Sequence, residues 1–471
     1  MSTTQPRSRK ANSPPTQSGR QTDVSSPPLK HQKLHNSDDK IVKEFGGPIG
    51  VTMMMIFFPL LMNYLWLCVQ VKSGSLLSLL SVKDIKIFFG LIAEHATPTW
   101  FATKLYLGFC LLQGFLAYVM PGPIVKGLPI PSENNKQLEY RCNGVWSFYT
   151  LAVIALIVHN TGIFPLTSIV ENFGPLMSVA IITGMACSFG MYFATMIGGK
   201  PIRMSGNVIY DIFMGAPLNP RIGRLDLKMF AEIRIPWVIL FYVTVSAALK
   251  QREQAGHITP ELWFMMLAHF LYVNACMKGE ECIPTTWDIF YEKFGFMLIF
   301  WNMTGVPFTY CLSSLYLLKN GPQNHSNFHV AFCFGLLLFG YYIWDSAQSQ
   351  KNRFRMQQRG TYIPRRTFPQ LPWGTLKNPS YIQTKQGNML LTGGWWAYAR
   401  KIHYTADLMM ALSWGLITGV QSFIPYFYVT FFVFVLVHRV SRDMERCARK
   451  YGEDWEEYCR KVPYIFIPGV F

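Results

Sequence analysis

The sequence predicts an all-α, polytopic membrane protein with about ten transmembrane helices. Half of the residues are hydrophobic, 15% are charged and the mean hydropathy is +0.18, whereas soluble domains average about 25% charged residues. Apolar stretches close to the roughly 20 residues that cross a bilayer recur along the chain. The last of them, residues 426–437, runs straight into a dense block of charged and aromatic residues. A membrane span is therefore expected to deliver a polar site at its own end.

The first 43 residues form a separate segment. They contain eight Lys/Arg and three acidic residues and are rich in Ser, Pro, Gln and Asn, a composition that cannot bury enough apolar surface to fold. This segment lacks the continuous apolar core and the small-residue cleavage site of a signal peptide. We expect residues 1–43 to be a disordered basic cytoplasmic tail and residues 44–471 to be the transmembrane domain.

The candidate spans follow one another from Gly50 to the C-terminus. Some are short or polar for a span. They are expected near residues 51–71, 100–119, 146–164, 175–197, 236–249, 262–276, 294–318, 328–344, 405–419 and 426–438.

The region after the eighth candidate span is strongly basic. Residues 346–406 contain ten Lys/Arg and no acidic residue, so the positive-inside rule places this loop and the N-terminal tail in the cytoplasm. An even number of spans then places the C-terminus there too. Because the net charge of +17 is spread unevenly, it does not indicate nucleic-acid binding. Topology and contact with anionic membrane lipids alone would also explain this loop.

Spacing within the basic loop also favours a binding site. Lys351 and Arg355 stand at i and i+4, so on a continuing helix both cations project from one side and can clamp a phosphate. The segment 391–396, Leu-Thr-Gly-Gly-Trp-Trp, combines glycines for close backbone approach with flat aromatic faces. Aromatic residues also anchor proteins at membrane interfaces. Four polar residues follow at helical spacing: Arg400, His403, Tyr404 and Asp407.

The C-terminal helix carries two polar stripes. Asp443, Cys447 and Tyr451 fall at successive i+4 steps. The adjacent stripe is cationic and comprises Arg442, Arg446 and Lys450. A solvated juxtamembrane helix would show the same charges.

The end of that helix can also be predicted. Gly452 is expected to stop it, and Asp454 to cap a short second helix that carries Trp455 and Tyr458 and ends before Pro463.

These C-terminal segments together predict a cationic pocket with acceptors and aromatic rings, formed by helices and loops in residues 345–471. This composition suits a phosphorylated nucleotide, and a nicotinamide cofactor is the leading candidate. The chain contains neither Gly-x-Gly-x-x-Gly nor Gly-x-x-x-x-Gly-Lys-Ser/Thr. Its ten cysteines are scattered without paired metal-ligand spacing, so no metal site is predicted.

Two polar islands interrupt the apolar middle of the chain. Residues 206–221 are dense in turn formers and polar groups, which would also suit a tight loop. Residues 271–281 bring Glu280 and Glu281 into an apolar context, where a carboxylate at the bilayer centre costs roughly 2.5–3.5 kcal/mol. These carboxyl groups must lie at the interface, line a wet cavity or be protonated. A protonated carboxyl is a usable general acid, and Tyr272 would share a face with Glu280 on a helix. An interfacial loop with a salt-bridged Lys278 is the alternative.

Residues 206–221 and 436–458 resemble the two diagnostic motifs of the membrane sterol reductases, the family of the C-14 sterol reductases, 7-dehydrocholesterol reductase and the lamin B receptor. The resemblance runs from about Glu44 to Phe471. It implies a ten-helix fold with NADPH held by the C-terminal helices. Position by position, it implies a cofactor site of Lys351, Arg355, Leu391, Trp396, His403, Tyr404, Asp443, Cys447, Ala448, Arg449, Lys450, Tyr451 and Tyr458.

The same resemblance implies the catalytic groups. Tyr272 matches a family tyrosine that acts beside the nicotinamide, with Asp443 as its companion, and Glu280 is a further candidate for the proton route. Many relatives have an acidic residue and then Trp-Asn-Glu after that tyrosine. This chain has residues 274–280 as Asn-Ala-Cys-Met-Lys-Gly-Glu, so only the final Glu is retained. This departure puts carry-over of ring-double-bond specificity in doubt.

Within the family, residues 44–47, 215–223, 225–232, 271–281, 286–302 and 399–407 most resemble the fungal reductases of the sterol side chain. The resemblance implies NADPH-dependent reduction of the C-24(28) double bond of ergosta-5,7,22,24(28)-tetraen-3β-ol, the last step of ergosterol biosynthesis. It implies an endoplasmic reticulum membrane location, a sterol substrate and other ergosterol-pathway enzymes as candidate partners. Reduction of the C-14 or C-7 ring double bond and a non-enzymatic scaffold like the lamin B receptor are the alternatives.

Overall fold

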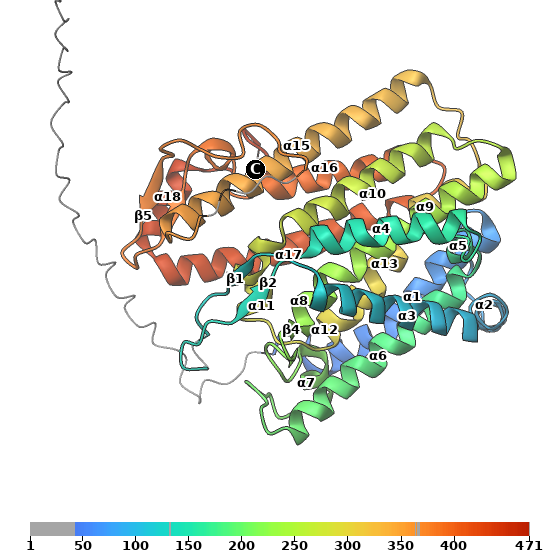
Figure 1. Ribbon diagram of the computed structural model, residues 1–471, viewed down its shortest axis with the longest axis horizontal. Coiled ribbons are helices and arrows are strands. Elements are labelled where there is room, and N and C mark those ends of the chain that lie inside the picture. Colours follow the sequence, from blue (N-terminus) through green and yellow to red (C-terminus); the bar gives the residue numbers. More distant parts are fainter. Residues whose placement is uncertain (1–42, 131–132, 363, 365–367, 471) are drawn as a thin grey trace, which may run out of the picture.

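A computed structural model describes residues 43–130, 133–362, 364 and 368–470. Most of these residues are helical, and the strands form three short antiparallel hairpins. Long helices run roughly side by side through the molecule, while α18 and β5 gather at one end of it, beside the ends of α15 and α17 (Figure 1). The expected tail, residues 1–43, lies almost wholly outside the described residues, so its disorder stays a prediction.

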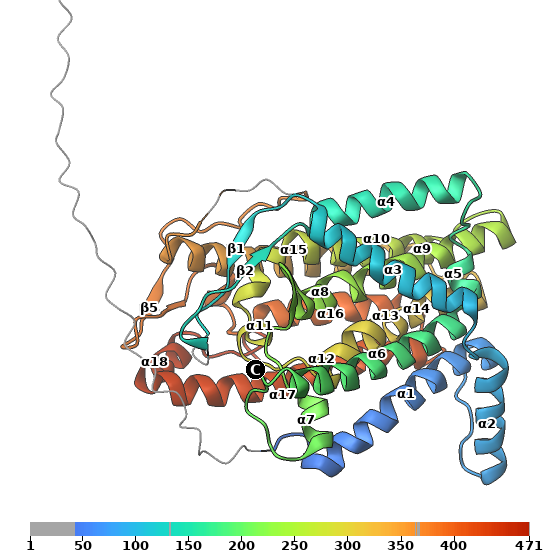
Figure 2. The same cartoon turned by 60° about the horizontal axis from the view of Figure 1, so that its bottom comes forward.

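The first half of the described chain contains seven α-helices and two hairpin strands. The helices are α1 (Gly47–Lys72), α2 (Val82–His95), α3 (Trp100–Val119), α4 (Gly144–Asn160), α5 (Ser168–Glu171), α6 (Phe173–Ile197) and α7 (Val208–Met214). Strands β1 (Ile124–Lys126) and β2 (Glu139–Arg141) pair between α3 and α4. Helix α2 crosses the direction of the other helices at one end (Figure 2).

The second half begins with the small hairpin of β3 (Arg221–Ile222) and β4 (Leu225–Asp226). Its helices are α8 (Leu227–Arg234), α9 (Pro236–Ala255), α10 (Pro260–Lys278), η2 (Glu280–Thr285), α11 (Trp287–Phe290), α12 (Phe296–Phe300), η3 (Trp301–Gly305), α13 (Val306–Thr309), α14 (Leu312–Asn320), α15 (Asn327–Gln358), η4 (Gly394–Ala397), α16 (Ile402–Leu416), η5 (Ile424–Tyr426), α17 (Phe427–Tyr451) and α18 (Glu453–Lys461). Strands β5 (Tyr381–Gln383) and β6 (Met389–Leu391) form the third hairpin.

Six helical stretches in the described part are long and apolar enough to cross a membrane. They are Gly47–Lys72, Trp100–Val119, Phe173–Ile197, Leu227–Ala255, Asn327–Gln358 and Ile424–Tyr451. The four other predicted spans also fall on helices: α4, α10, the broken run from α12 to α14, and α16. The structure thus confirms a mostly helical membrane protein, whereas the number ten stays a prediction.

Capping residues explain where several helices begin. The Thr99 hydroxyl accepts the backbone N–H of Ala102 at the start of α3, and Ser326 accepts that of His329 at the start of α15. Such side chains satisfy N–H groups that have no partner within the helix. The predicted span at residues 294–318 is divided by the π-helical turn η3, where a Cβ added at Gly305 would lie 2.4 Å from the Trp301 ring.

The polar island at residues 206–221 folds as the short helix α7 followed by a compact turn. Asp211 accepts the backbone N–H of Ser205 at 2.9 Å, and Arg221 pairs with Asp226 at 3.3 Å. Gly215, at φ +98°, crosses Gly295 so closely that a Cβ added at Gly295 would lie 2.1 Å from the Gly215 nitrogen. The tight-loop interpretation therefore describes the part after α7 and not the helix itself.

Candidate active site

The cationic pair predicted from spacing lies on one helix, because α15 continues from its apolar part to Gln358. The Lys351 ammonium sits 4.0 Å from the centre of the Trp396 ring. Arg355, one turn further, is exposed and interacts electrostatically with Tyr451 and Tyr458. Residues from α15, α17 and α18 therefore meet around these two cations.

The glycine pair in residues 391–396 permits the close approach that the sequence indicated. Gly394 has φ +63°, and a Cβ there would lie 2.4 Å from the Gln350 side-chain oxygen. That oxygen accepts the Trp395 backbone N–H at 2.9 Å, and the Trp396 indole donates to the Ala347 carbonyl at 2.9 Å. The turn is thus fastened to α15, and Trp396 is held beneath Lys351.

Helix α16 adds a buried histidine to this group. The His403 ring lies 5.0 Å from the Trp396 ring and 4.1 Å from the Tyr404 ring, measured between centroids. His403 is buried, and its Nδ1 has no hydrogen-bond partner among the residues that the structure describes. A buried nitrogen without a partner is costly, which makes this atom a point where a bound polar ligand would be stabilised.

Asp443 on α17 faces the same group of cations. Its carboxylate forms ion pairs with Lys401 and, at 3.0 Å, with Arg446, and it interacts electrostatically with Lys351. Cys447 and Tyr451, the next two members of its stripe, pack in an apolar cluster with Tyr458 of α18. Burial raises the pKa of the Tyr458 phenol, so its hydroxyl keeps its proton at neutral pH.

The remaining residues of the predicted run 447–451 divide between two sides of α17. Ala448 and Arg449 are exposed, and Arg449 pairs only loosely with Glu445, at 4.0 Å. Lys450 lies 5.0 Å from the Tyr451 ring centre. The structure thus brings Cys447, Lys450 and Tyr451 together with other cofactor candidates, whereas Ala448 and Arg449 are exposed.

Two members of the cationic stripe on α17, Arg442 and Arg446, contact side chains of other segments of the protein. Arg442 pairs with Glu44 at 2.9 Å and with Glu292 at 3.3 Å, while Arg446 lies 3.8 Å from the Trp287 ring centre. These contacts dock α17 against the segment just before α1 and against the segment between η2 and α12.

The junction after α17 is only partly as predicted. Gly452 ends the helix, and a second helix carrying Trp455 and Tyr458 ends before Pro463. The capping role expected for Asp454 is wrong, because this residue lies inside α18. Its carboxylate instead accepts the Lys385 backbone N–H at 2.7 Å and so ties α18 to the β5–β6 hairpin.

The Tyr272 ring packs against tryptophan rings inside the helix bundle. It is 7% exposed, and its ring centroid lies 4.6 Å from that of Trp237 and 5.3 Å from that of Trp344. Its hydroxyl donates to Asp407 at 3.4 Å. Asp443, its expected companion, is instead paired with Lys401 and Arg446. The carboxyl group that the structure places next to Tyr272 is therefore Asp407.

Glu280 lies in a buried ion pair. Helix α10 ends at Lys278, so the helical face expected to join Tyr272 to Glu280 is interrupted. The Glu280 carboxylate lies 2.5 Å from the Arg234 guanidinium and also accepts the Gly144 backbone N–H at 2.7 Å. Lys278, which the alternative interpretation expects to be salt-bridged, pairs with Asp345.

Helix α16 connects the two parts of the site. His403, beside Trp396, and Asp407, beside Tyr272, are four residues apart and lie on the same side of the helix. Four residues correspond to a rise of about 6 Å. The cationic group around Lys351 and the buried tyrosine are therefore neighbours along one helix face.

This site contains clustered cations, the carboxyl groups of Asp443 and Asp407, several aromatic rings and a buried nitrogen that has no partner among the described residues. These groups fit a phosphorylated dinucleotide, whose phosphates need cations and whose rings need flat apolar contacts. In the described part of the chain, no group of three His, Cys, Asp or Glu side chains is arranged to hold a metal ion. Fold and site together define a multi-pass membrane protein with a polar, nucleotide-compatible site at the ends of its helices.

The chain belongs to the Ergosterol biosynthesis ERG4/ERG24 family, whose model matches residues 39–471. It is 48% identical over 443 residues to the Delta(24(24(1)))-sterol reductase erg4A of Aspergillus fumigatus, covering 93% of this chain and 94% of that protein. The identity to the Delta(24(24(1)))-sterol reductase of Gibberella zeae is 47%, over 91% of this chain and 73% of that one. A Delta(14)-sterol reductase from Methylotuvimicrobium alcaliphilum is 37% identical, over 92% and 97%. The resemblance found in the two motifs is thereby confirmed.

The contacts of three residues in this region were not predicted from the sequence. Lys401 is one of ten cations in the basic loop, and its pairing with Asp443 has no local pattern that predicts it. The helical spacing of Asp407 from His403 does not indicate its contact with Tyr272. Arg234 lies on a helix that also carries Lys228 and Glu232, so no sequence pattern singled it out as the partner of Glu280.

Proposed function

We propose that this protein is an NADPH-dependent sterol reductase that reduces the C-24(28) double bond of ergosta-5,7,22,24(28)-tetraen-3β-ol to give ergosterol. The observation that carries the proposal is the pairing of Tyr272 with Asp407 next to the cationic site, in a chain that is 48% identical to a protein named Delta(24(24(1)))-sterol reductase. The membrane bundle supplies the apolar surroundings that a sterol needs.

The reaction requires a proton donor, because no carbonyl polarises the double bond. In the proposed mechanism the Tyr272 hydroxyl gives its proton to C-28, which becomes a methyl group and leaves an allylic cation centred on C-24. NADPH supplies the hydride that completes C-24. Asp407 and Tyr428, which both interact with the Tyr272 hydroxyl, are the groups through which its oxygen is reprotonated. The surrounding tryptophan rings exclude water, which would otherwise capture the cation.

The cofactor would be held by the residues around Lys351. The stripe of Asp443, Cys447 and Tyr451 forms one wall of the proposed pocket, and Trp396 with His403 forms another. Arg355 is the group best suited to the 2′-phosphate, because the residue is exposed and a guanidinium can bind phosphate in a bidentate fashion. Asp443 then positions Lys401 and is not the proton donor.

Lys351→Ala and Arg355→Ala are expected to raise the Michaelis constant for NADPH. Loss of a charged hydrogen bond costs roughly 1.5–3 kcal/mol, which corresponds to about ten-fold or more. With NADH, which lacks the 2′-phosphate, Arg355→Ala should have a much smaller effect. Arg252→Ala is the matched control, since Arg252 is an exposed residue in the last turn of α9 and is not a cofactor candidate. If the Michaelis constant for NADPH is unchanged in both variants, the charges of the basic loop set the membrane topology and do not bind the cofactor.

We also propose the topology expected from the sequence. Ten spans in an endoplasmic reticulum membrane, with the N- and C-termini in the cytoplasm, would place the basic loop, residues 346–406, and the C-terminal stripes on the cytoplasmic side. NADPH would then enter from the cytoplasm, and the sterol from the membrane. Other enzymes of ergosterol synthesis remain candidate partners.

Sterol profiling of a strain from which the gene is deleted tests the reaction. Accumulation of ergosta-5,7,22,24(28)-tetraenol is the expected result. Sterols with an unreduced C-14 or C-7 ring double bond would assign one of those activities instead. A normal sterol profile would favour a scaffold without enzymatic activity.

A further inference from the structure

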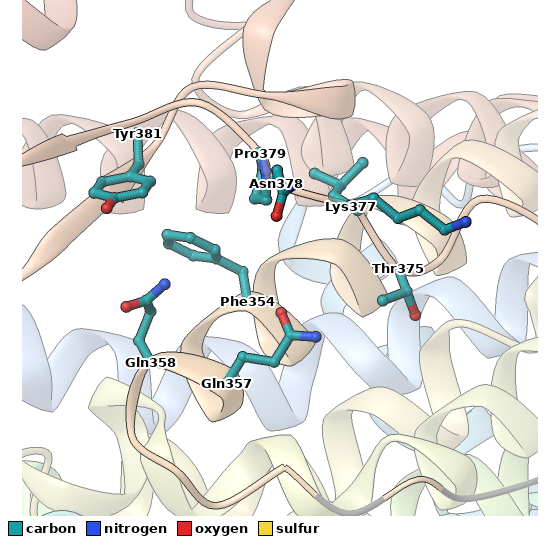
Figure 3. Close-up of a pocket in the computed structure, with 9 residues that line it drawn as sticks. Phe354, Gln357, Gln358, Thr375, Lys377, Asn378, Pro379 and Tyr381 are labelled. Carbon is teal, nitrogen blue, oxygen red and sulfur yellow. The ribbon is translucent and has the colours of Figure 1, made fainter. Parts of the chain in front are cut away.

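The two ends of the helix bundle differ in character. At one end, the C-terminal part of α15 and the segment that leads into β5 enclose a pocket of about 720 Å³, with Gln357 and Gln358 on the helix side and Asn378 across from them (Figure 3). Helix α15 has 32 residues and is roughly 48 Å long at about 1.5 Å per residue, whereas the hydrocarbon core of a bilayer is about 30 Å thick. Because the charged residues of α15 lie in its C-terminal half, this polar end of the bundle emerges from the membrane. Helix α2 lies at the opposite end (Figure 1 and Figure 2).

Helix α2, Val82–His95, lies across the direction of the spans (Figure 2). A reciprocal pair of hydrogen bonds between Ser81 and Asp84 begins the helix. It joins the end of α1, at Lys72, to the start of α3, at Trp100, and both of these helices are long and apolar enough to cross a membrane. Trp100 is 81% exposed, and tryptophans and lysines at the ends of spans are typical of the headgroup level. A helix that lies across the spans at this level runs along the membrane surface.

The exposed surface of α2 includes an apolar stripe. Phe88 is buried and packs against the bundle, with its ring centroid 6.3 Å from that of Tyr64 on α1. Val82, Ile85 and Phe89 stand at i, i+3 and i+7 and therefore share one face of the helix. They are 72%, 43% and 51% exposed, so the protein itself leaves this face largely uncovered. Apolar side chains gathered on an exposed face indicate contact with an apolar partner.

The adjacent face of α2 is charged. Lys83 and Glu94 lie about three turns apart on one side of the helix, and Lys86 stands between them and the apolar stripe; all three residues are exposed. Ile87, which is 50% exposed, is an exception on the charged side. An apolar face next to a face that carries lysines is typical of helices that lie in the membrane interface. The lysine stems cover apolar surface while their ammonium groups reach the polar headgroups.

We propose that α2 is an interfacial anchor that lies in one leaflet of the membrane, with Val82, Ile85 and Phe89 among the acyl chains and Lys83 and Lys86 on the phosphates of phospholipids. In the proposed topology this is the lumenal leaflet. A second copy of the chain fits this face less well, because three partly exposed side chains fall far short of the roughly 800 Å² that each partner buries in a stable protein interface. The inference requires a membrane protein and does not depend on the proposed reaction.

Photo-cross-linking of the full-length protein in phosphatidylcholine vesicles tests the anchor. In Phe89→Bpa, p-benzoylphenylalanine (Bpa) replaces an aromatic side chain and reacts on irradiation with C–H bonds that it touches. We expect lipid adducts, measured by mass spectrometry, to be at least about five-fold more abundant in Phe89→Bpa than in Lys83→Bpa, because the charged face of an interfacial helix points to water. Val82→Bpa, on the same stripe, is the second variant if Phe89→Bpa does not fold. Phe115→Bpa is the reference for a lipid-facing position, because Phe115 is 62% exposed within the span α3.

The distribution of adducts decides what covers the apolar stripe. Lipid adducts in Phe89→Bpa and Val82→Bpa at a level near that of Phe115→Bpa, with few in Lys83→Bpa, support the anchor. Covalent dimers in place of lipid adducts would overturn it and assign the stripe to a second copy of the chain. Equal labelling of Phe89→Bpa and Lys83→Bpa, or lipid adducts in Phe115→Bpa alone, would show that the stripe does not face the acyl chains and would also overturn it.

Discussion

Tyr272→Phe is expected to lower turnover by about 10²- to 10⁴-fold, the usual contribution of a general acid. Phenylalanine keeps the ring that packs between Trp237 and Trp344 and removes only the hydroxyl that donates to Asp407. NADPH binding should therefore be retained. Steady-state turnover of purified protein, together with cofactor affinity, gives the two quantities needed.

The carboxyl partner of this tyrosine can be tested in the same assay. Asp407→Asn should also reduce turnover, and the double variant Tyr272→Phe/Asp407→Asn should be hardly slower than Tyr272→Phe, because the two groups act on one proton. The matched control is Tyr242→Phe, which removes a buried hydroxyl that has no hydrogen-bond partner in the structure. Full activity in Tyr272→Phe would exclude this residue from the mechanism, and additive losses would separate Asp407 from it.

Glu280→Ala is expected to destabilise the fold by about 3–5 kcal/mol, the usual cost of leaving one member of a buried ion pair unpaired. The Glu280 and Arg234 side chains are 3% and 2% exposed, and Arg234 also donates to Asn143 at 2.7 Å. This pair joins α8, the start of α4 and η2. Chemical denaturation in detergent measures the loss.

A double variant distinguishes a structural role for Glu280 from a catalytic one. Arg234→Met with Glu280→Leu should be more stable than either single alanine variant and should keep most of its turnover. Glu171→Ala, which removes an exposed partner of Lys250, should cost less than about 1 kcal/mol. A well-folded double variant without activity would show that Glu280 takes part in the chemistry.

Patterns local to one helix predicted much of this structure. Each predicted span falls on a helix, Lys351 and Arg355 share one face of α15, and Gly452 ends α17. These features depend on apolar length, the helical period and the backbone freedom of glycine, all of which are contained in a few neighbouring residues. The family motifs added the correct family, as the match over residues 39–471 shows.

Contacts between segments that are distant in the sequence could not be predicted from such local patterns. Asp407 and Asp443 are both acidic residues close to the basic loop, and spacing alone cannot say which one meets Tyr272. The packing of α10 against α16 decides it, since Asp407 faces Tyr272 while Lys401 holds Asp443. Likewise, α10 ends at Lys278, and Glu280 beyond its end pairs with Arg234. Local patterns did not predict this pair, because Arg234 lies far from Glu280 in the chain.

The central claim is that this protein adds a proton to C-28 and a hydride to C-24 of the sterol side chain. Purified protein incubated in deuterated water with NADPH and ergosta-5,7,22,24(28)-tetraenol provides the most direct measurement. The account predicts ergosterol that carries solvent deuterium in its C-28 methyl group and none at C-24. Recovery of unchanged tetraenol, reduction of a ring double bond, or solvent deuterium at C-24 would contradict it.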